Sequence, residues 1–360
     1  MYELNILFVA FIVFIVGILS LKIKVTPIFL EVIAGLIVGN FFLFEPNQTL
    51  NILSGMGILV LMYMAGLEID FDFLKKKIKP SLYIGGLNFF IPFFGISFFC
   101  YYIYNMLFIQ AILIALALST TSIAIVFPIL ASKGKLTQDM KLILSSVMIV
   151  DIICMIFLGF FSSAFSYLTL IFIVFMALLT YFFPYLGRKI FKKKGEKTIA
   201  IELRFVLFSL LALSFTSEHV GLEPALIAFF FGMLTSSFVV EHIELQKQLN
   251  GIAFGFLTPI FFFLTGTKIK LFLAQESIVF LIILFLIAYL SKYYSALFAI
   301  KKYLKTKAQY YAKLFNFCLT FGFIVITFGL EKAIIGEELF SVIGIVIILS
   351  SLSGFLAKEK

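Results

Sequence analysis

Long apolar segments recur along the whole sequence and constrain the fold more than any other feature. One of them, LILSSVMIVDIICMIFLGFF at 142–161, has the roughly twenty residues that a helix needs to cross a bilayer. Dividing the chain at its polar residues predicts thirteen such helices, at 4–21, 27–43, 51–69, 80–103, 108–131, 142–163, 165–187, 199–217, 222–240, 251–267, 276–299, 312–330 and 337–357.

The composition agrees with this division. The chain has 62% hydrophobic and 13% charged residues, which is far from the balance of a soluble domain. The connections between the predicted helices are short. We therefore predict an all-α polytopic membrane protein, a single transmembrane domain over residues 1–360, with no soluble regulatory domain.

The lysine and arginine residues indicate the orientation of the helices. Most fall in alternate connections, at Lys22, Lys24, Lys75, Lys76, Lys77, Lys79, Lys133, Lys135, Lys141, 188–197, Lys247, Lys301, Lys302, Lys305, Lys307, Lys313, Lys358 and Lys360. The other connections hold only Lys268, Lys270 and Lys332. Because positive charge collects on the cytoplasmic side, we expect the N-terminus outside and the C-terminus in the cytoplasm. The net charge of +9 is then a signal of orientation, and we expect no nucleic-acid partner.

Two parts of the chain resemble each other at an offset of 200 residues. YMAGLEIDFDFL at 63–74 aligns with FLTGTKIKLFLA at 263–274, and LSTTSIAIV at 118–126 aligns with CLTFGFIVI at 318–326. The matches fall on the third and tenth and on the fifth and twelfth predicted helices, an odd offset of seven, so the two parts cross the membrane in opposite directions. This pattern predicts inverted repeats over about 27–163 and 222–357, joined by linking helices at about 165–217, and such repeats are typical of secondary transporters.

Asp151 is the most informative polar residue within a predicted helix. A carboxylate in hydrocarbon is costly unless it faces a cavity, pairs with a cation or takes up a proton. We interpret it as an ion-binding or proton-binding group, with transient binding of Na⁺ or K⁺. The alternative is a protonated, hydrogen-bonded aspartate that only ties helices together.

Four consecutive hydroxyl residues, Ser119 to Ser122, lie within another predicted helix, and Thr120 and Thr121 are the two at its centre. Thr320 and Gly322 occupy the matching positions of the second repeat. We expect both helices to be interrupted there, because unwound backbone at this depth lines protein or water and offers oxygen ligands to a small cation. The alternative is that the hydroxyl groups bond to their own helices.

Lys292 is a lysine deep within a predicted helix, at about the same depth as Asp151, Ser122 and Thr320, counted at about 1.5 Å per residue. We interpret it as a cation that balances or competes at the Asp151 site. The alternative is a side chain that extends to the cytoplasmic surface. A second packing signal is the Gly-x-x-x-Gly of Gly35 and Gly39, which predicts a close helix contact.

Several segments resemble the bacterial cation:proton antiporter-2 family of monovalent cation/proton antiporters, which have the sodium/hydrogen exchanger fold. The segments are FLEVIAGLIVGN (29–40), LMYMAGLEIDFDFLKKK (61–77), LALSTTSIAIVFPIL (116–130) and PIFFFLTGTKIKL (259–271). The resemblance implies that Asp151 is the ion-binding aspartate and Lys292 the intramembrane lysine. It also implies two crossed, broken helices in a core bundle that moves like an elevator against a dimer-forming bundle.

The chain departs from this family at two places. Val150 stands before Asp151, where the family has Asp, Asn or Gln, and the segment 321–330 carries no acid. The missing neighbour of Lys292 favours electroneutral exchange of one cation for one proton over an exchange that moves net charge.

The resemblance implies a secondary active antiporter in the bacterial inner membrane that exchanges Na⁺ or K⁺ for H⁺, lies in the lipid bilayer and forms a homodimer. We expect no enzymatic activity and no cofactor. One alternative is a sodium-coupled symporter of an organic anion on a related inverted-repeat fold. Another is an intramembrane aspartyl protease, but Asp151 stands alone at its depth and such a site needs two aspartates.

Overall fold

A computed structural model of the chain describes residues 2–23, 25–42, 44–68, 76–132, 134, 136–162, 201–219, 222–240, 242–304 and 306–355. Within these residues every regular element is a helix. Nine helical segments of this part are long and apolar enough to cross a membrane, and two shorter apolar helices accompany them. The predicted all-α, multi-pass architecture is confirmed. The predicted helix 165–187 and the basic segment 188–197 lie outside the described residues.

The chain forms two compact units. Unit 1 consists of Met1–Pro46, Phe71–Ile156 and Phe262–Lys360, and unit 2 of Asn47–Asp70 and Phe157–Phe261. The helices of unit 1 are α1 (Tyr2–Ile23), α2 (Pro27–Phe41), α5 (Ile78–Phe98) with the π-helix η1 (Phe99–Ile103), α6 (Phe108–Ser119), α7 (Ile123–Ala131), α8 (Gln138–Ser162), α14 (Leu271–Glu276), α15 (Ile278–Lys301), α16 (Ala308–Leu314), α17 (Leu319–Glu331) and α18 (Glu337–Phe355). Those of unit 2 are α3 (Gln48–Leu67), α10 (Ile201–His219), α11 (Pro224–Val240), α12 (Ile243–Ile252) and the π-helix η2 (Ala253–Leu257). The last residues of α8 belong to unit 2, and α13 (Thr258–Thr267) begins in unit 2 and ends in unit 1.

Two basic residues that the sequence analysis places in connections between helices lie within helices instead. Lys247 lies on α12, which continues through η2 into α13, so that this segment runs over Ile243–Thr267 and not only over 251–267. Lys247 pairs with Glu244 at 2.9 Å on an exposed face, as expected for a polar turn that extends a helix beyond its apolar part. Lys313 similarly lies on α16.

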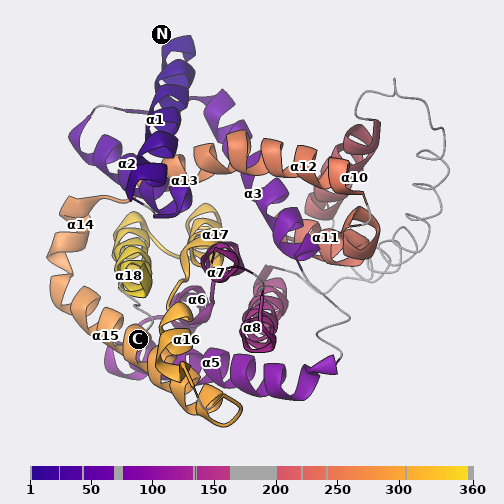
Figure 1. The fold of residues 1–360 in the computed structure, drawn as a ribbon. Helices are drawn as coiled ribbons and strands as arrows, with labels where there is room; N and C mark the ends of the chain where they lie inside the picture. The colour runs from indigo at the N-terminus through magenta and orange to yellow at the C-terminus, as the bar shows by residue number, and fades with distance from the viewer. Residues whose placement is uncertain are drawn as a thin grey trace. The chain divides into compact units, whose positions relative to one another are not determined.

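In unit 1, α5 and α15 pack side by side in opposite directions. The rings of Tyr83 and Tyr303 lie 5.7 Å apart near one end, and those of Phe99 and Phe280 lie 6.0 Å apart near the other. Helices α14, α15 and α5 form an arc around α6, α16, α17 and α18 (Figure 1). The arc therefore encloses the helices that carry the hydroxyl residues singled out by the sequence.

Helix boundaries recur at the offset of 200 residues. Helices α5 and α15 begin at 78 and 278, α6 and α16 begin at 108 and 308, and α7 and α17 end at 131 and 331. Corresponding helices α5 and α15 run antiparallel, as an inverted repeat requires. The ring contacts that show this antiparallel packing, Tyr83 with Tyr303 and Phe99 with Phe280, all lie within unit 1.

Each unit contains a very close helix crossing built on a pair of glycines. In unit 1, a methyl group on Gly35 would overlap the carbonyl oxygen of Phe263, and one on Gly266 would overlap that of Val32. In unit 2, Gly66 and Gly232 lie in the same way against the carbonyl oxygens of Phe229 and Tyr63. Gly39 also meets backbone, that of Thr267, so the close packing predicted for Gly35 and Gly39 is confirmed. Only glycine allows backbones to approach this closely.

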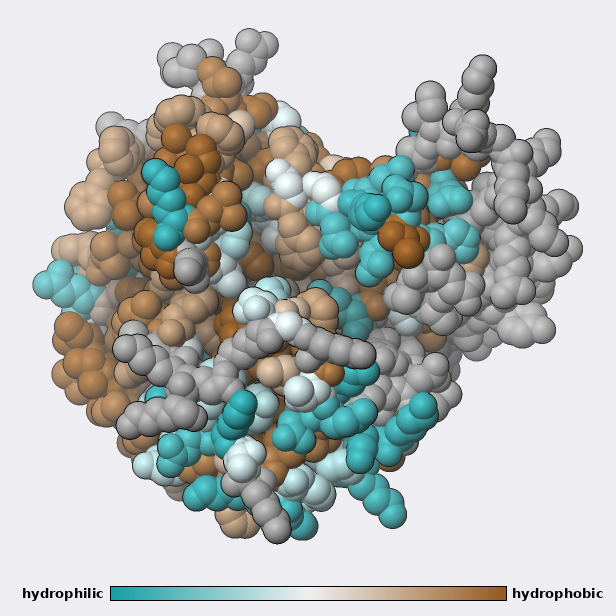
Figure 2. Space-filling model, in the orientation of Figure 1, coloured by the Kyte–Doolittle hydropathy of each residue, from teal (hydrophilic) through white to brown (hydrophobic). Residues whose placement is uncertain are grey.

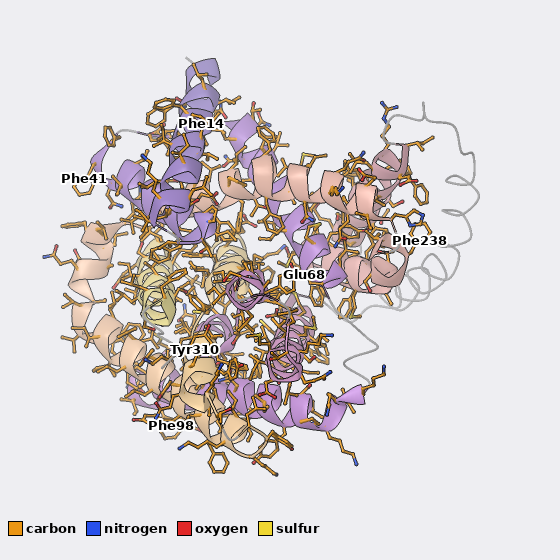
Figure 3. The ribbon with its side chains drawn as sticks, in the orientation of Figure 1. Phe14, Phe41, Glu68, Phe98, Phe238 and Tyr310 are labelled. Atoms are coloured by element: carbon orange, nitrogen blue, oxygen red, sulfur yellow. The ribbon has the colours of Figure 1, made fainter. Side chains whose placement is uncertain are left out.

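Large apolar side chains cover much of the surface of unit 1. Phe14, Phe41 and Phe98 point away from the packed helices (Figure 3) and are each more than half exposed. Apolar residues also cover the surface over the first part of α15, below a hydrophilic group at α14 (Figure 2). Such exposure is unfavourable in water and is expected for surfaces that face hydrocarbon.

Candidate cation and proton site

The first predicted helix break is present in unit 1. Helix α6 ends at Ser119 and α7 begins at Ile123, and both Thr120 and Ser122 have extended backbone. The four hydroxyl residues from Ser119 to Ser122 are all buried. Residues without helical backbone in a buried segment leave carbonyl and amide groups that need partners, so this break is a place where a ligand or another segment can bind.

The second break is also present, but its predicted position was wrong. Helix α16 ends at Leu314 and α17 begins at Leu319, so the break covers 315–318, while Thr320 and Gly322 lie in the first turn of α17. The sequence of the break is FNFC, and its aromatic residues are as apolar as the helices on either side, so they do not indicate an interruption. Asn316 was the polar signal that could have located it.

The two breaks are bonded directly to each other. The amide of Ser122 donates to the carbonyl oxygen of Phe317 at 2.6 Å, and Thr121 Oγ1 donates to that of Phe315 at 3.1 Å. The hydroxyls of Ser122 and Thr320 share a hydrogen bond of 2.6 Å. Three of the hydroxyl groups predicted to bind ions therefore hold the crossing together.

Gly322 has a packing role in this geometry. A methyl group on it would lie 3.1 Å from the carbonyl oxygen of Ala117 and 3.0 Å from the side chain of Ile347. Ala117 lies on α6, just before the first break. Gly322 thus lets α6 and α17 cross closely, and this brings the two breaks within hydrogen-bonding distance.

Lys292 reaches into the first break. It lies on α15, is 1% exposed, and its Nζ donates a hydrogen bond of 2.5 Å to the carbonyl oxygen of Thr120. The alternative in which this side chain extends to the membrane surface is excluded by this contact. The ammonium group instead uses a carbonyl that the end of α6 leaves free.

Asp151 lies at the same place, on α8. Its side chain is 2% exposed and interacts electrostatically with Lys292. One turn further along α8, Cys154 lies beside Thr120 and interacts with both charged residues. Val150 is fully buried. The structure thus places Lys292 in contact with Thr120 and Asp151 near enough for its charge to act on Lys292.

Ser119 has a buried hydroxyl with no hydrogen-bond partner in the part of the chain that the structure describes. It is the last residue of α6 and adjoins Thr120. An oxygen ligand beside a free helix end is suited to a small hard cation. The hydroxyls of Ser119 and Thr120 and the carbonyl of Thr120 are therefore the oxygen atoms of this break that are not used to bond it to the other break.

Asn88 is a site residue that was not predicted from the sequence. It is fully buried on α5, and its Nδ2 donates to the carbonyl oxygen of Lys292 at 2.9 Å and to Ser295 Oγ at 3.2 Å. Its Oδ1 accepts from Thr121 Oγ1 at 3.4 Å. The available signal was an amide residue in an apolar run of membrane-spanning length.

Comparison with known proteins places this arrangement in context. A family model described as "Sodium/hydrogen exchanger, transmembrane" matches residues 9–358. The chain is 31% identical over 227 residues to a probable Na⁺/H⁺ antiporter 3 of Methanocaldococcus jannaschii, a match covering 61% of this chain and 58% of that protein. It is 26% identical over 354 residues to a Na⁺/H⁺ antiporter of Enterococcus hirae, covering 89% of this chain and 88% of that protein.

A putative Na⁺/H⁺ antiporter YjbQ of Bacillus subtilis is 30% identical over 231 residues, which is 58% of this chain and 38% of that protein. In two of these three relatives, therefore, less than two thirds of the relative's length is matched. Among solved structures, the sodium proton antiporter MjNhaP1 of Methanocaldococcus jannaschii at pH 8 superposes with a TM-score of 0.72 over 99% of this chain and 96% of that one. The sequences are 14% identical, so this likeness concerns the fold.

Proposed function

The chain belongs to the sodium/hydrogen exchanger family, and we propose that it is a secondary active antiporter that exchanges a monovalent cation, Na⁺ or K⁺, for protons. The family consists of transporters, so the protein is not an enzyme. In this proposal it lies in the bacterial inner membrane as a homodimer, with its N-terminus outside and its C-terminus in the cytoplasm.

The meeting of Asp151, Lys292 and the end of α6 is the observation that carries the proposal. A buried carboxylate, the carbonyl of Thr120 and the hydroxyl of Ser119 are hard oxygen ligands for a small cation. The same carboxylate can take up a proton instead. Because one carboxyl group cannot hold both, occupancy from alternate sides of the membrane exchanges one ion for the other.

Lys292 acts as a competitor in this mechanism. Its ammonium holds the carbonyl of Thr120, which is a position that an incoming cation can use. When the cation binds, the ammonium gives up this contact. When the cation leaves, the ammonium returns and neutralises the site, so that the empty site does not hold an unpaired charge in a buried environment.

Thr121, Ser122 and Thr320 have a different part in the proposal. Their hydroxyls form hydrogen bonds that join one break to the other. They therefore hold the carbonyl groups of the breaks in position and are not themselves ligands of the ion. Removing one of them is expected to weaken cation binding indirectly. The alternative of a sodium-coupled symporter finds no support, since the three relatives are named antiporters.

Everted vesicles test the proposal. Vesicles that contain the protein are acidified inside by respiration, a pH-sensitive dye is quenched, and NaCl, KCl and LiCl are added in turn. Cation-dependent dequenching in these vesicles, absent from vesicles without the protein, is the expected result and identifies the transported cation. Dequenching that requires an organic anion together with Na⁺ would overturn the antiporter proposal in favour of symport.

A further inference from the structure

We infer that α5 is a spacer that sets the distance between the helix of Asp151 and the helix of Lys292, and that Gly85 and Asn88 are positioning residues for exchange. This inference rests on the proposed function. It concerns a helix that carries neither the carboxylate nor the ammonium, and it assigns roles to two residues that act on the cation site through other groups.

Gly85 sets the contact of α5 with α8. A methyl group on Gly85 would lie 2.5 Å from the carbonyl oxygen of Ser146 and 3.0 Å from the side chain of Ile149. Both residues precede Asp151 on α8 by less than two turns. The backbones of the two helices are therefore in contact near the carboxylate, and any side chain at this position would force them apart.

Asn88 sets the contact of α5 with α15. Its amide nitrogen donates to the carbonyl oxygen of Lys292 itself and to Ser295 Oγ, and Ser295 Oγ donates to the same carbonyl at 3.0 Å. The amide oxygen of Asn88 accepts from Thr121 in the first break. One side chain thus fixes the backbone of the lysine relative to the break that its ammonium contacts.

Gly85 and Asn88 are three residues apart and therefore lie on the same side of α5, about one turn from each other. Through this side, α5 contacts the backbone near Asp151 and the backbone of Lys292. A helix that contacts both of these elements holds the two charged residues at a defined separation, and the interaction between buried charges depends strongly on that separation. If α5 only packed against its neighbours, substitutions at Gly85 and Asn88 would change stability alone. If α5 sets the separation of the two charged residues, the same substitutions also change the cation affinity and the pH dependence of exchange.

Substitutions at neighbouring glycines separate these two roles. A methyl group on Gly86 would find open space, with no atom of another element within 4 Å, so Gly86→Ala is a matched control for Gly85→Ala on the same helix. The test measures the apparent KM for Na⁺ or K⁺, the maximal rate and the pH profile of exchange in proteoliposomes that contain equal amounts of monodisperse protein.

We expect Gly85→Ala and Asn88→Ala to raise the apparent KM for the cation by about fivefold or more, the size expected for one lost buried hydrogen bond or one displaced contact. We also expect both to shift the pH profile, whereas Gly86→Ala leaves KM and profile as in the wild type. In a Lys292→Gln background, Asn88→Ala should raise KM much less than it does in the wild type, because the group that it positions is gone.

Unchanged KM and pH profile in a folded Gly85→Ala or Asn88→Ala protein would overturn the inference, as would equal effects of Gly85→Ala and Gly86→Ala. If one of the two variants does not fold, the other carries the test, since each removes a different contact. Absence of exchange in the wild type with every cation would count against the proposed function instead, so the two failures are distinguishable.

Discussion

The ammonium of Lys292 donates a hydrogen bond of 2.5 Å to the carbonyl oxygen of Thr120, the first residue after α6 ends. The sequence suggested that Lys292 lacks a neighbour, because Val150 replaces the polar residue expected before Asp151. The structure supplies a backbone carbonyl in its place. A helix break therefore serves as the partner of a buried lysine, which only a non-helical segment can do at this depth.

Asp151→Asn should abolish cation-dependent proton movement while the protein still folds. Asparagine has nearly the same shape but neither ionises nor carries a proton, so the exchange of cation for proton has no shared group. Dequenching of a pH dye in everted vesicles measures the effect. Asp139→Asn is the matched control, since Asp139 lies in the first turn of the same helix and is only half-buried, and it should exchange like the wild type. Exchange by the Asp151 variant would move the site elsewhere.

Exchange should be electroneutral, with one cation for each proton. In the proposed mechanism Lys292 keeps its proton when it gives up the carbonyl of Thr120, and Val150 offers no second acid, so Asp151 is the group that changes charge. Proteoliposomes clamped at zero and at a negative potential should therefore exchange at the same rate. Net movement of one charge would couple to the potential by about 2.3 kcal/mol per 100 mV, so a clear voltage dependence would reject the one-for-one stoichiometry.

Gly66→Ala should destabilise unit 2, because a methyl group there overlaps the backbone of α11. We expect a loss of about 1–3 kcal/mol, as for other overpacked sites, or failure to fold. Gly55 lies on the same helix with open space around it, so Gly55→Ala should be neutral or slightly stabilising. Thermal stability in detergent, followed by size-exclusion chromatography, measures both variants. Equal stability of Gly66→Ala and Gly55→Ala would show that α3 and α11 adjust to the added methyl group without any loss of stability.

Glu68 should make stability depend on pH. It lies in the turn after α3, beyond the membrane-spanning segment, and burial raises the pKa of its carboxyl to about 7. The folded state then binds the proton more tightly than the unfolded state, whose pKa is near 4.5. Stability relative to Glu68→Gln should fall as the pH rises from about 4.5 to 7 and should level off above that range.

Thermal stability of the wild type and of Glu68→Gln, measured side by side across this pH range, tests the prediction. The glutamine variant cancels the contributions of all other titrating groups, which both proteins share. A difference between the two proteins that stays constant from about pH 4.5 to 7 would show that the carboxyl of Glu68 is not desolvated in the folded protein.

The apolar segments, the carboxylate at Asp151 and the first helix break were all predictable from the sequence. The cause is local in each case. An apolar run of sufficient length must form a helix in a bilayer, and a charged or multiply hydroxylated stretch within it is so costly that it stands out. The repeat at an offset of 200 residues was also detectable, because glycines and charged residues at helix ends recur at that spacing.

The position of the second break and the roles of Asn88 and Gly85 were not predicted; Asn316 and Asn88 marked polar positions in apolar runs, but nothing in the sequence indicated their partners. FNFC at 315–318 contains aromatic residues that suit a continuous helix, and its interruption is stabilised by hydrogen bonds from Thr121 and Ser122, which are far away along the chain. Such partners leave no local pattern in the sequence.

A bundle of membrane helices with an acid and a broken helix at membrane depth follows from the amino-acid sequence alone, because the bilayer penalises polar groups wherever they occur along the chain. Which atoms meet depends on the three-dimensional fold. The partner of Lys292 at Thr120, the bonds between the two breaks and the spacing imposed by α5 depend on how distant helices cross, and crossing geometry is set by packing between residues that are far apart in the chain.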